Sequence, residues 1–283
     1  IEKAAEIFKN GTDEELCYVI KTNIFSNLSA SDKLKAIDYG KINVEKLETS
    51  KTPHSKILGI DFLVNLRLPY RTSSKLSEGL AFFAEKLNNY KKNNDSSGIN
   101  NCYYVLSGFY RTIGLYEPAI YNMKKSISYI DSSLIGERFF GIEPRNTKAI
   151  WINNTGVLSD FYLQMGDYEK AIKAGETALK VALRYYNEIG KTRRGDYSLY
   201  TARHMANAKI FANQLDSVDY YLKMAELYTV NAPDLKAYLL QIRSLYNIKK
   251  GELGVADSLL RLSWQLVNQN QLSVSSASGQ LEP

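Results

Sequence analysis

Two stretches of this chain are almost the same. Residues 106–120 read LSGFYRTIGLYEPAI and residues 158–172 read LSDFYLQMGDYEKAI, so nine of fifteen positions are identical at a separation of 52 residues. Similar segments at a fixed spacing are typical of a chain built from repeated supersecondary units. Such a unit cannot bury its apolar face alone, so neighbouring units must stack. The repeat therefore constrains the fold more than any other feature of the sequence.

Each copy divides at a glycine into two amphipathic segments. Before Gly114 and before Gly166, apolar residues recur three or four positions apart, as on one face of a helix. Glycine can adopt the left-handed backbone conformation that ends a helix, and a second periodic run begins two residues later. Ala119 and Ala171 fall one turn into that second run, where a close helix crossing leaves room for little more than a methyl group. Each copy is therefore predicted to be a helix, a tight turn and an antiparallel helix.

These offsets resemble those of the tetratricopeptide repeat (TPR) family, which places Leu, a small residue, Tyr, Gly, Tyr and Ala at fixed positions. The early Trp of the family is missing from both copies. The resemblance implies an all-α fold, a right-handed α-α superhelix of about six TPR-like helix pairs. The matching residues are Leu106, Ser107, Tyr110, Gly114, Tyr116 and Ala119, and then Leu158, Ser159, Tyr162, Gly166, Tyr168 and Ala171.

Weaker copies flank the two good ones. We predict one TPR-like domain over residues 1–267, followed by a polar tail or linker over residues 268–283. The second helix of the last pair is expected to cover residues 255–267. The best repeats cover residues 100–132 and 152–185, and the weaker ones cover residues 13–48, 54–90, 197–229 and 237–267.

The weaker copies keep the key positions with substitutions. Asn213 and Gly251 occupy the turn position, and Val218 and Ala256 occupy the position of the anchor alanine. The segment 68–73 is predicted to join the two helices of the pair 54–90.

Two loops are longer than the repeat requires, at residues 134–146 and 188–197. The first carries Phe139 and Phe140, which we expect to pack back onto the helices. Trp151 and Trp264 are both predicted to lie in the core.

The reactive residues and the charge exclude several classes of function. The formal net charge is +6, but no block of five or six like charges occurs, so direct nucleic-acid binding is not predicted. His54 and His204 are 150 residues apart, and no HExxH, GxSxG or short Cys/His spacing occurs. We therefore expect no metal, no cofactor and no enzymatic activity. Cys17 and Cys102 are predicted to be buried thiols rather than a disulfide.

The sequence says little about location. No run of 18 apolar residues occurs, so no membrane-spanning segment is predicted. Both the cytoplasm and the periplasm remain open as compartments. The chain begins at Ile1, and we expect it to be a trimmed or mature fragment.

The TPR resemblance also implies where a partner would bind. The concave surface of such a solenoid is lined mainly by the first helix of each pair, and ligands of the family commonly lie there. Asn and Gln side chains suit a peptide backbone, and Arg suits a carboxylate, although each position could be merely a solvated one. The predicted groove residues are Asn101, Tyr104, Gly108, Arg111 and Thr112, then Asn153, Gly156, Asp160, Leu163 and Gln164, and then Tyr200, Arg203, Asn207 and Phe211.

Two functions fit this surface. The first is a peptide- or protein-binding module, such as the sensory or interaction region of a bacterial signalling protein. The alternative is a structural adaptor that assembles a complex through the convex face or the ends of the solenoid.

Overall fold

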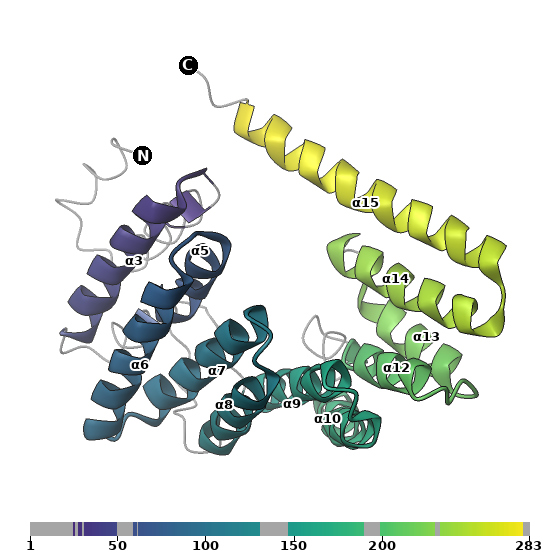
Figure 1. Cartoon of the computed structure of the whole chain (residues 1–283), viewed down its shortest axis with the longest axis horizontal. Coiled ribbons are helices and arrows are strands. Elements are labelled where there is room, and N and C mark those ends of the chain that lie inside the picture. The colour runs from purple at the N-terminus through teal and green to yellow at the C-terminus, as the bar shows by residue number, and fades with distance from the viewer. Residues whose placement is uncertain are drawn as a thin grey trace. The chain divides into compact units, whose positions relative to one another are not determined.

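The chain forms only helices and turns wherever its structure is described. The computed structural model describes residues 25, 28–29, 31–49, 59–60, 62–130, 147–189, 199–229 and 233–279 (Figure 1). The predictions for the loop 134–146 with Phe139 and Phe140, for Cys17 and for most of the loop 188–197 lie outside the described residues.

The helices fall into two compact units, residues 1–147 and residues 148–283. The sequence predicts one repeat domain across this boundary, and that stays a prediction. Unit 1 contains α3 (Lys33–Glu48), α5 (Arg67–Thr72), α6 (Leu76–Lys92), α7 (Ser96–Thr112) and α8 (Tyr116–Ile130). Unit 2 contains α9 (Thr147–Gln164), α10 (Tyr168–Ile189), α12 (Ala202–Phe211), α13 (Val218–Thr229), α14 (Pro233–Lys250) and α15 (Leu253–Gly279).

Neighbouring helices pack in the order in which they occur. In unit 1, α6 packs on α7 and α7 on α8; in unit 2, α12 packs on α13, α13 on α14 and α14 on α15. In addition, α5 contacts α7 and α12 contacts α14, so the first helices of adjacent pairs lie side by side. This is the packing that a stack of helix pairs requires, and it confirms the all-α repeat fold predicted from the sequence.

The predicted turns are confirmed in detail. Gly114, Gly166 and Gly251 have φ of +77°, +76° and +81°, and Asn213 has φ of +57°. The N–H of Gly114 donates to the Arg111 carbonyl (3.0 Å), and the N–H of the next residue, Leu115, donates to the Tyr110 carbonyl (2.9 Å). The other three turns repeat both bonds, which together form a Schellman cap.

The anchor positions are buried, as the sequence predicts. Ala119, Ala171 and Val218 are fully buried, and Ala256 is almost so. In unit 2, a serine of the first helix donates directly to the anchor carbonyl: Ser159 Oγ to Ala171 O at 2.6 Å, and Ser244 Oγ to Ala256 O at 2.9 Å. A larger side chain at either end of such a bond would separate the two helices.

The segment 68–73 is the first correction to the sequence-based prediction. Instead of a loop it forms most of α5, and the connection to α6 lies at residues 73–75. Pro69 is tolerated because it lies in the first turn of α5, where a backbone N–H has no partner in the helix. Pro69 and Tyr70 are buried, and this burial outweighs the turn signal that the proline gave.

The last helix is the second correction. α15 continues to Gly279, twelve residues beyond the predicted end at residue 267. Trp264, predicted to be core, is 69% exposed on α15, whereas Trp151 is half-buried and packs beside Ile152 and Tyr185.

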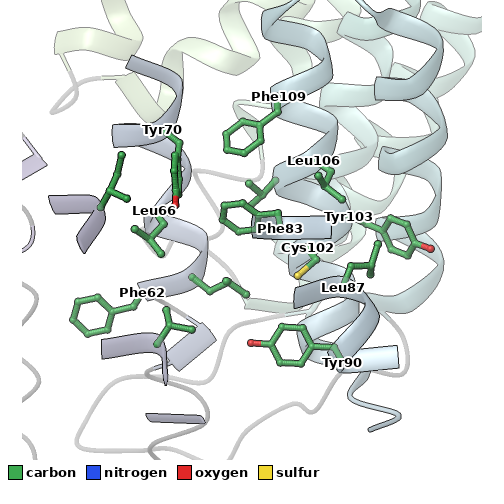
Figure 2. Packing of buried hydrophobic residues seen from close by; sticks show 14 of the residues in the cluster. Phe62, Leu66, Tyr70, Phe83, Leu87, Tyr90, Cys102, Tyr103, Leu106 and Phe109 are labelled. Atoms are coloured by element: carbon green, nitrogen blue, oxygen red, sulfur yellow. The ribbon is translucent and has the colours of Figure 1, made fainter. Parts of the chain in front are cut away.

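An aromatic core holds unit 1 together (Figure 2). Tyr70 of α5, Phe83 of α6 and Phe109 of α7 meet edge to face, with ring centroids 5.5–6.4 Å apart. Each buried aromatic ring contributes a large apolar area, and edge-to-face geometry adds to it. Cys102 is buried in the same cluster, as the sequence predicted.

Candidate functional site

Three arginines gather on one face of unit 1, between α5 and α7. We call this the arginine face and define it as Arg67, Arg71, Tyr104, Arg111 and Thr112. Arg67 and Arg71 are one turn apart on α5, and Tyr104 and Arg111 are two turns apart on α7, so each pair shares a side of its helix. Because α5 contacts α7, the two rows lie next to each other.

Burial of one side of α5 determines where its arginines lie. Leu66 and Tyr70 are fully buried in the core of unit 1 (Figure 2). Arg67 and Arg71 follow these two residues directly in sequence, so they lie along the adjoining edge of the helix. The core packing therefore presents both guanidinium groups on the same edge.

The side chains of α7 hold the two arginines in place. The Arg67 guanidinium carbon lies 5.3 Å from the centroid of the Tyr104 ring, a cation–π contact. Arg71 Nε donates to Thr112 Oγ1 at 3.1 Å, and that hydroxyl donates in turn to the Gly108 carbonyl at 2.8 Å. Both guanidinium groups thus have one contact that fixes them, and each retains N–H groups that these contacts do not use.

Positive charge is concentrated on this face, where Arg67, Arg71 and Arg111 lie close together. Within the described ranges, neither Arg67 nor Arg71 forms an ion pair with Asp or Glu. Partial burial of the side chain, and then the charges of Arg111 and Arg67, lower the pKa of the Arg71 guanidinium. The charged form of Arg71 is thus disfavoured first by loss of solvation and then by the like charges beside it.

The corresponding region of unit 2 is arranged differently. Asp160 Oδ1 of α9 lies 2.7 Å from Nδ1 of His204 on α12, and the His204 side chain is only 1% exposed. Gly156, one turn before Asp160, adjoins the same imidazole, because a Cβ there would lie 2.6 Å from His204 Cδ2. The prediction that Gly156 faces an open groove is therefore wrong, and Asp160 serves a contact between helices.

Two further predicted groove positions of unit 2 are buried. Tyr200 is 2% exposed, its hydroxyl donates to the Leu235 carbonyl at 3.3 Å, and its ring lies 4.2 Å below the Arg203 guanidinium carbon. Leu163 is 7% exposed. Both were expected on the open surface, and both instead contribute to packing because an apolar or aromatic body gains more from burial than from water.

The remaining predicted residues lie at or near the surface. The Asn101 amide donates to the Ser97 carbonyl of its own helix at 2.7 Å, and Asn153 donates to Asn154 Oδ1 at 3.4 Å. Asn207 is half-buried on α12, and Gln164 and Phe211 are exposed. Of all the predicted residues, Tyr104, Arg111 and Thr112 are the ones that the structure groups into a charged site.

The sequence analysis missed Arg67 and Arg71, although a signal for them existed. The two arginines are four residues apart in LRLPYRT, the spacing of neighbours on a helix. Reading this segment as a loop hid that spacing.

The described residues contain no group of three or more His, Cys, Asp or Glu side chains that could hold a metal ion. None of the described helices combines the length and the apolar character needed to cross a membrane.

Comparison with known proteins identifies the fold. No protein-family model and no curated protein matches the sequence. Among solved structures, the chain is similar to a Rap protein in complex with competence and sporulation factor, with 15% identity and a TM-score of 0.62 over 97% of this chain and 70% of that one.

Two further structures show the same likeness. BtubC (BKLC) from P. vanneervenii is 11% identical, with a TM-score of 0.61 over 89% of this chain and 94% of that one. A kinesin-light-chain protein from Podosopora anserina with nearly identical TPR-like repeats is 11% identical, with a TM-score of 0.54 over 75% of this chain and 96% of that one. The chain therefore has a TPR-type fold.

Proposed function

We propose that this chain is a non-enzymatic module that binds a peptide or protein segment on the arginine face of unit 1. The observation that carries the proposal is the pair Arg67 and Arg71, which are held in place by Tyr104 and Thr112 and have no carboxylate partner among the described residues. Maintaining such a cluster costs free energy through like-charge repulsion, which a bound partner would relieve. The TPR-type fold supports the proposal, because stacked helix pairs offer extended surfaces for binding.

A steric block on this face provides the test. Gly108 lies on α7 between Tyr104 and Arg111, and a Cβ added there meets nothing within 4 Å. Gly108→Trp should therefore fill the face without disturbing the core. Gly254→Trp on α15 is the matched control, since Gly254 is equally open.

The measurement uses peptides selected from a random display library against the full chain. We expect fluorescence polarisation to show at least a tenfold loss of affinity with Gly108→Trp and little change with Gly254→Trp. Failure to select any peptide, or an equal effect of both variants, would contradict binding at this face.

We infer further that the module acts as the sensory or interaction region of a bacterial signalling protein. The likeness to the Rap protein with its bound factor supports this finer proposal. The coding sequence beyond residue 283 tests it: an effector domain there would support the proposal, and a stop codon would contradict it.

The alternative, a structural adaptor, is favoured by the exposed apolar residues of α15. Leu253, Leu260 and Trp264 are 64%, 44% and 69% exposed and lie along one side of the helix. Leu222, which follows its anchor residue by four positions as Leu260 does, is fully buried in the unit 2 core. Light scattering should show whether the chain self-associates and whether Trp264→Ser abolishes this while Tyr220→Ser, on α13, does not. A monomer at all concentrations would contradict self-assembly through α15.

A further inference from the structure

The arginine face has a chemistry that narrows the class of ligand. Arg71 uses its Nε on Thr112, which leaves the two terminal nitrogens of its guanidinium for another acceptor. Arg67 lies against the Tyr104 ring, with its guanidinium carbon 5.3 Å from the ring centroid, and no hydrogen bond to a described residue uses its guanidinium N–H groups. Both side chains therefore present donors from a fixed position.

A fixed guanidinium pair selects for particular acceptors. Arginine binds planar anionic groups through two parallel N–H···O bonds, and such charge-assisted bonds are about twice as strong as neutral ones. A neutral amide of the same shape offers only one carbonyl oxygen as an acceptor and no charge. The site is thus expected to distinguish a carboxylate from the corresponding amide.

The surrounding charges point the same way. Beside the partial burial of its side chain, the charges of Arg111 and Arg67 disfavour the charged form of Arg71, and neither Arg67 nor Arg71 pairs with a carboxylate of the described residues. Ion pairs elsewhere in unit 1 join other groups, among them Lys75 with Glu78 and Lys86 with Glu48. An incoming carboxylate would reduce the repulsion among the three arginines as well as form its own hydrogen bonds.

We propose that the arginine face recognises an acidic peptide segment, with Arg67 and Arg71 binding its side-chain carboxylates. This inference rests on the proposed function, because it specifies the ligand of the same face. Arg111, at the end of α7, adds to the positive potential that attracts the segment.

The test compares acid and amide in otherwise identical peptides. The probes are two fluorescein-labelled decapeptides of alternating residues, (Glu-Ala)5 and (Gln-Ala)5, titrated with the full chain in low-salt buffer. We expect the Glu peptide to bind about tenfold or more tightly, with the difference shrinking as salt is raised. Equal affinity for the two peptides would overturn the inference.

The variants distinguish a specific site from general charge. The double variant Arg67→Gln/Arg71→Gln should lose the preference for Glu, whereas Lys124→Gln/Lys125→Gln on α8 removes the same charge from the same unit and should keep it. Arg71→Lys keeps the charge but not the planar fork, so it should also weaken the preference. If the arginine and the lysine double variants lost the preference for Glu equally, the peptide would be attracted by general charge and not bound at a specific site. That result would overturn the inference.

Two further arms complete the experiment. A phosphoserine peptide that bound more than tenfold more tightly than the Glu peptide would overturn the choice of a carboxylate. Display-selected peptides that require an open Gly108 but show no acid preference would sustain the proposed function and refute this inference alone. Circular dichroism melting of each variant checks folding, and we expect the double arginine variant to melt no lower than the wild type, because it loses like-charge repulsion.

Discussion

Helices α7 and α9 come from the two best copies of the repeat, yet they use the same positions in opposite ways. Tyr104 of α7 lies under Arg67, whereas Gly156, its counterpart 52 residues later, leaves space for the His204 ring. At the next turn, Gly108 is open, whereas Asp160 contacts His204.

The third pair of positions completes the contrast. Arg111 is exposed, whereas Leu163, its counterpart 52 residues later, is buried. The face of α7 thus stays open, and the face of α9 has become part of the packing between helices. A repeat can therefore preserve its scaffold while its outward positions change between recognition and stability.

The largest effects should be equal in the two helices, because they concern the positions that agree. Phe109 and Phe161 occupy the same place in the repeat and are both fully buried or nearly so. Phe109→Ala and Phe161→Ala should each lower the free energy of unfolding by about 3–5 kcal/mol. Urea unfolding monitored by circular dichroism measures the loss, and hydrogen exchange locates it. A cost below about 1 kcal/mol for either variant would break the equivalence.

The next effects should differ in sign between the helices. Gly156→Ala introduces a Cβ 2.6 Å from the buried His204 ring, so we expect a net loss of about 1–3 kcal/mol from overpacking. Gly108→Ala meets nothing and removes a flexible residue from a helix, so it should gain about 0.5–1 kcal/mol. Thermal melts of the two variants provide the comparison. Stabilisation of both variants would contradict the difference in packing between the open Gly108 position and the filled Gly156 position.

A smaller difference is expected at the charged positions. Asp160→Ala removes a hydrogen-bonding partner of His204 and should cost about 1 kcal/mol. Arg111→Ala alters an exposed residue and should change the free energy of unfolding by less than about 0.5 kcal/mol. Chemical denaturation at neutral pH separates the two, and an equal cost would indicate that Arg111 is as structural as Asp160.

The smallest effect concerns Cys102, which lies on the buried side of α7. Burial raises the pKa of the Cys102 thiol, so in the folded chain the thiol stays protonated at mildly alkaline pH. In the unfolded chain a thiol ionises near pH 8.5, so this group's contribution to stability is present below that pH and is lost as pH rises above it.

Thiol labelling tests the burial directly. In a Cys17→Ser variant, Cys102 should react with a thiol reagent at pH 8 only after addition of urea. Rapid labelling of the folded chain would place Cys102 on an accessible surface and contradict the packing of α7.

Much of the fold follows from the sequence because its determinants are local. Gly114 and Gly166 are needed where the backbone turns with positive φ, and Ala119 and Ala171 are needed where helices touch. These requirements act on a single residue within one or two turns of helix, so they leave a readable pattern. Asn213 shows that even a substituted turn can be recognised, since asparagine also tolerates positive φ.

The sequence-based predictions fail where contacts between residues far apart in the sequence determine the structure. Pro69 signals a turn by itself, but burial of Tyr70 against Phe83 and Phe109 keeps the segment helical. Trp264 is a large aromatic residue of the kind that often lies in a core, but no described helix covers its side of α15.

The same limit applies to the proposed binding face. The sequence by itself determined that this chain repeats a helix pair, which positions turn, which positions pack, and that Tyr104 and Arg111 point to one side of a helix. Only the tertiary structure decided that Arg67 and Arg71 join them, whereas Asp160 and Tyr200 are used in contacts between helices. The physical reason is that helical periodicity fixes the side of a helix on which a residue lies, but the neighbouring helix determines whether that side is open, charged or buried.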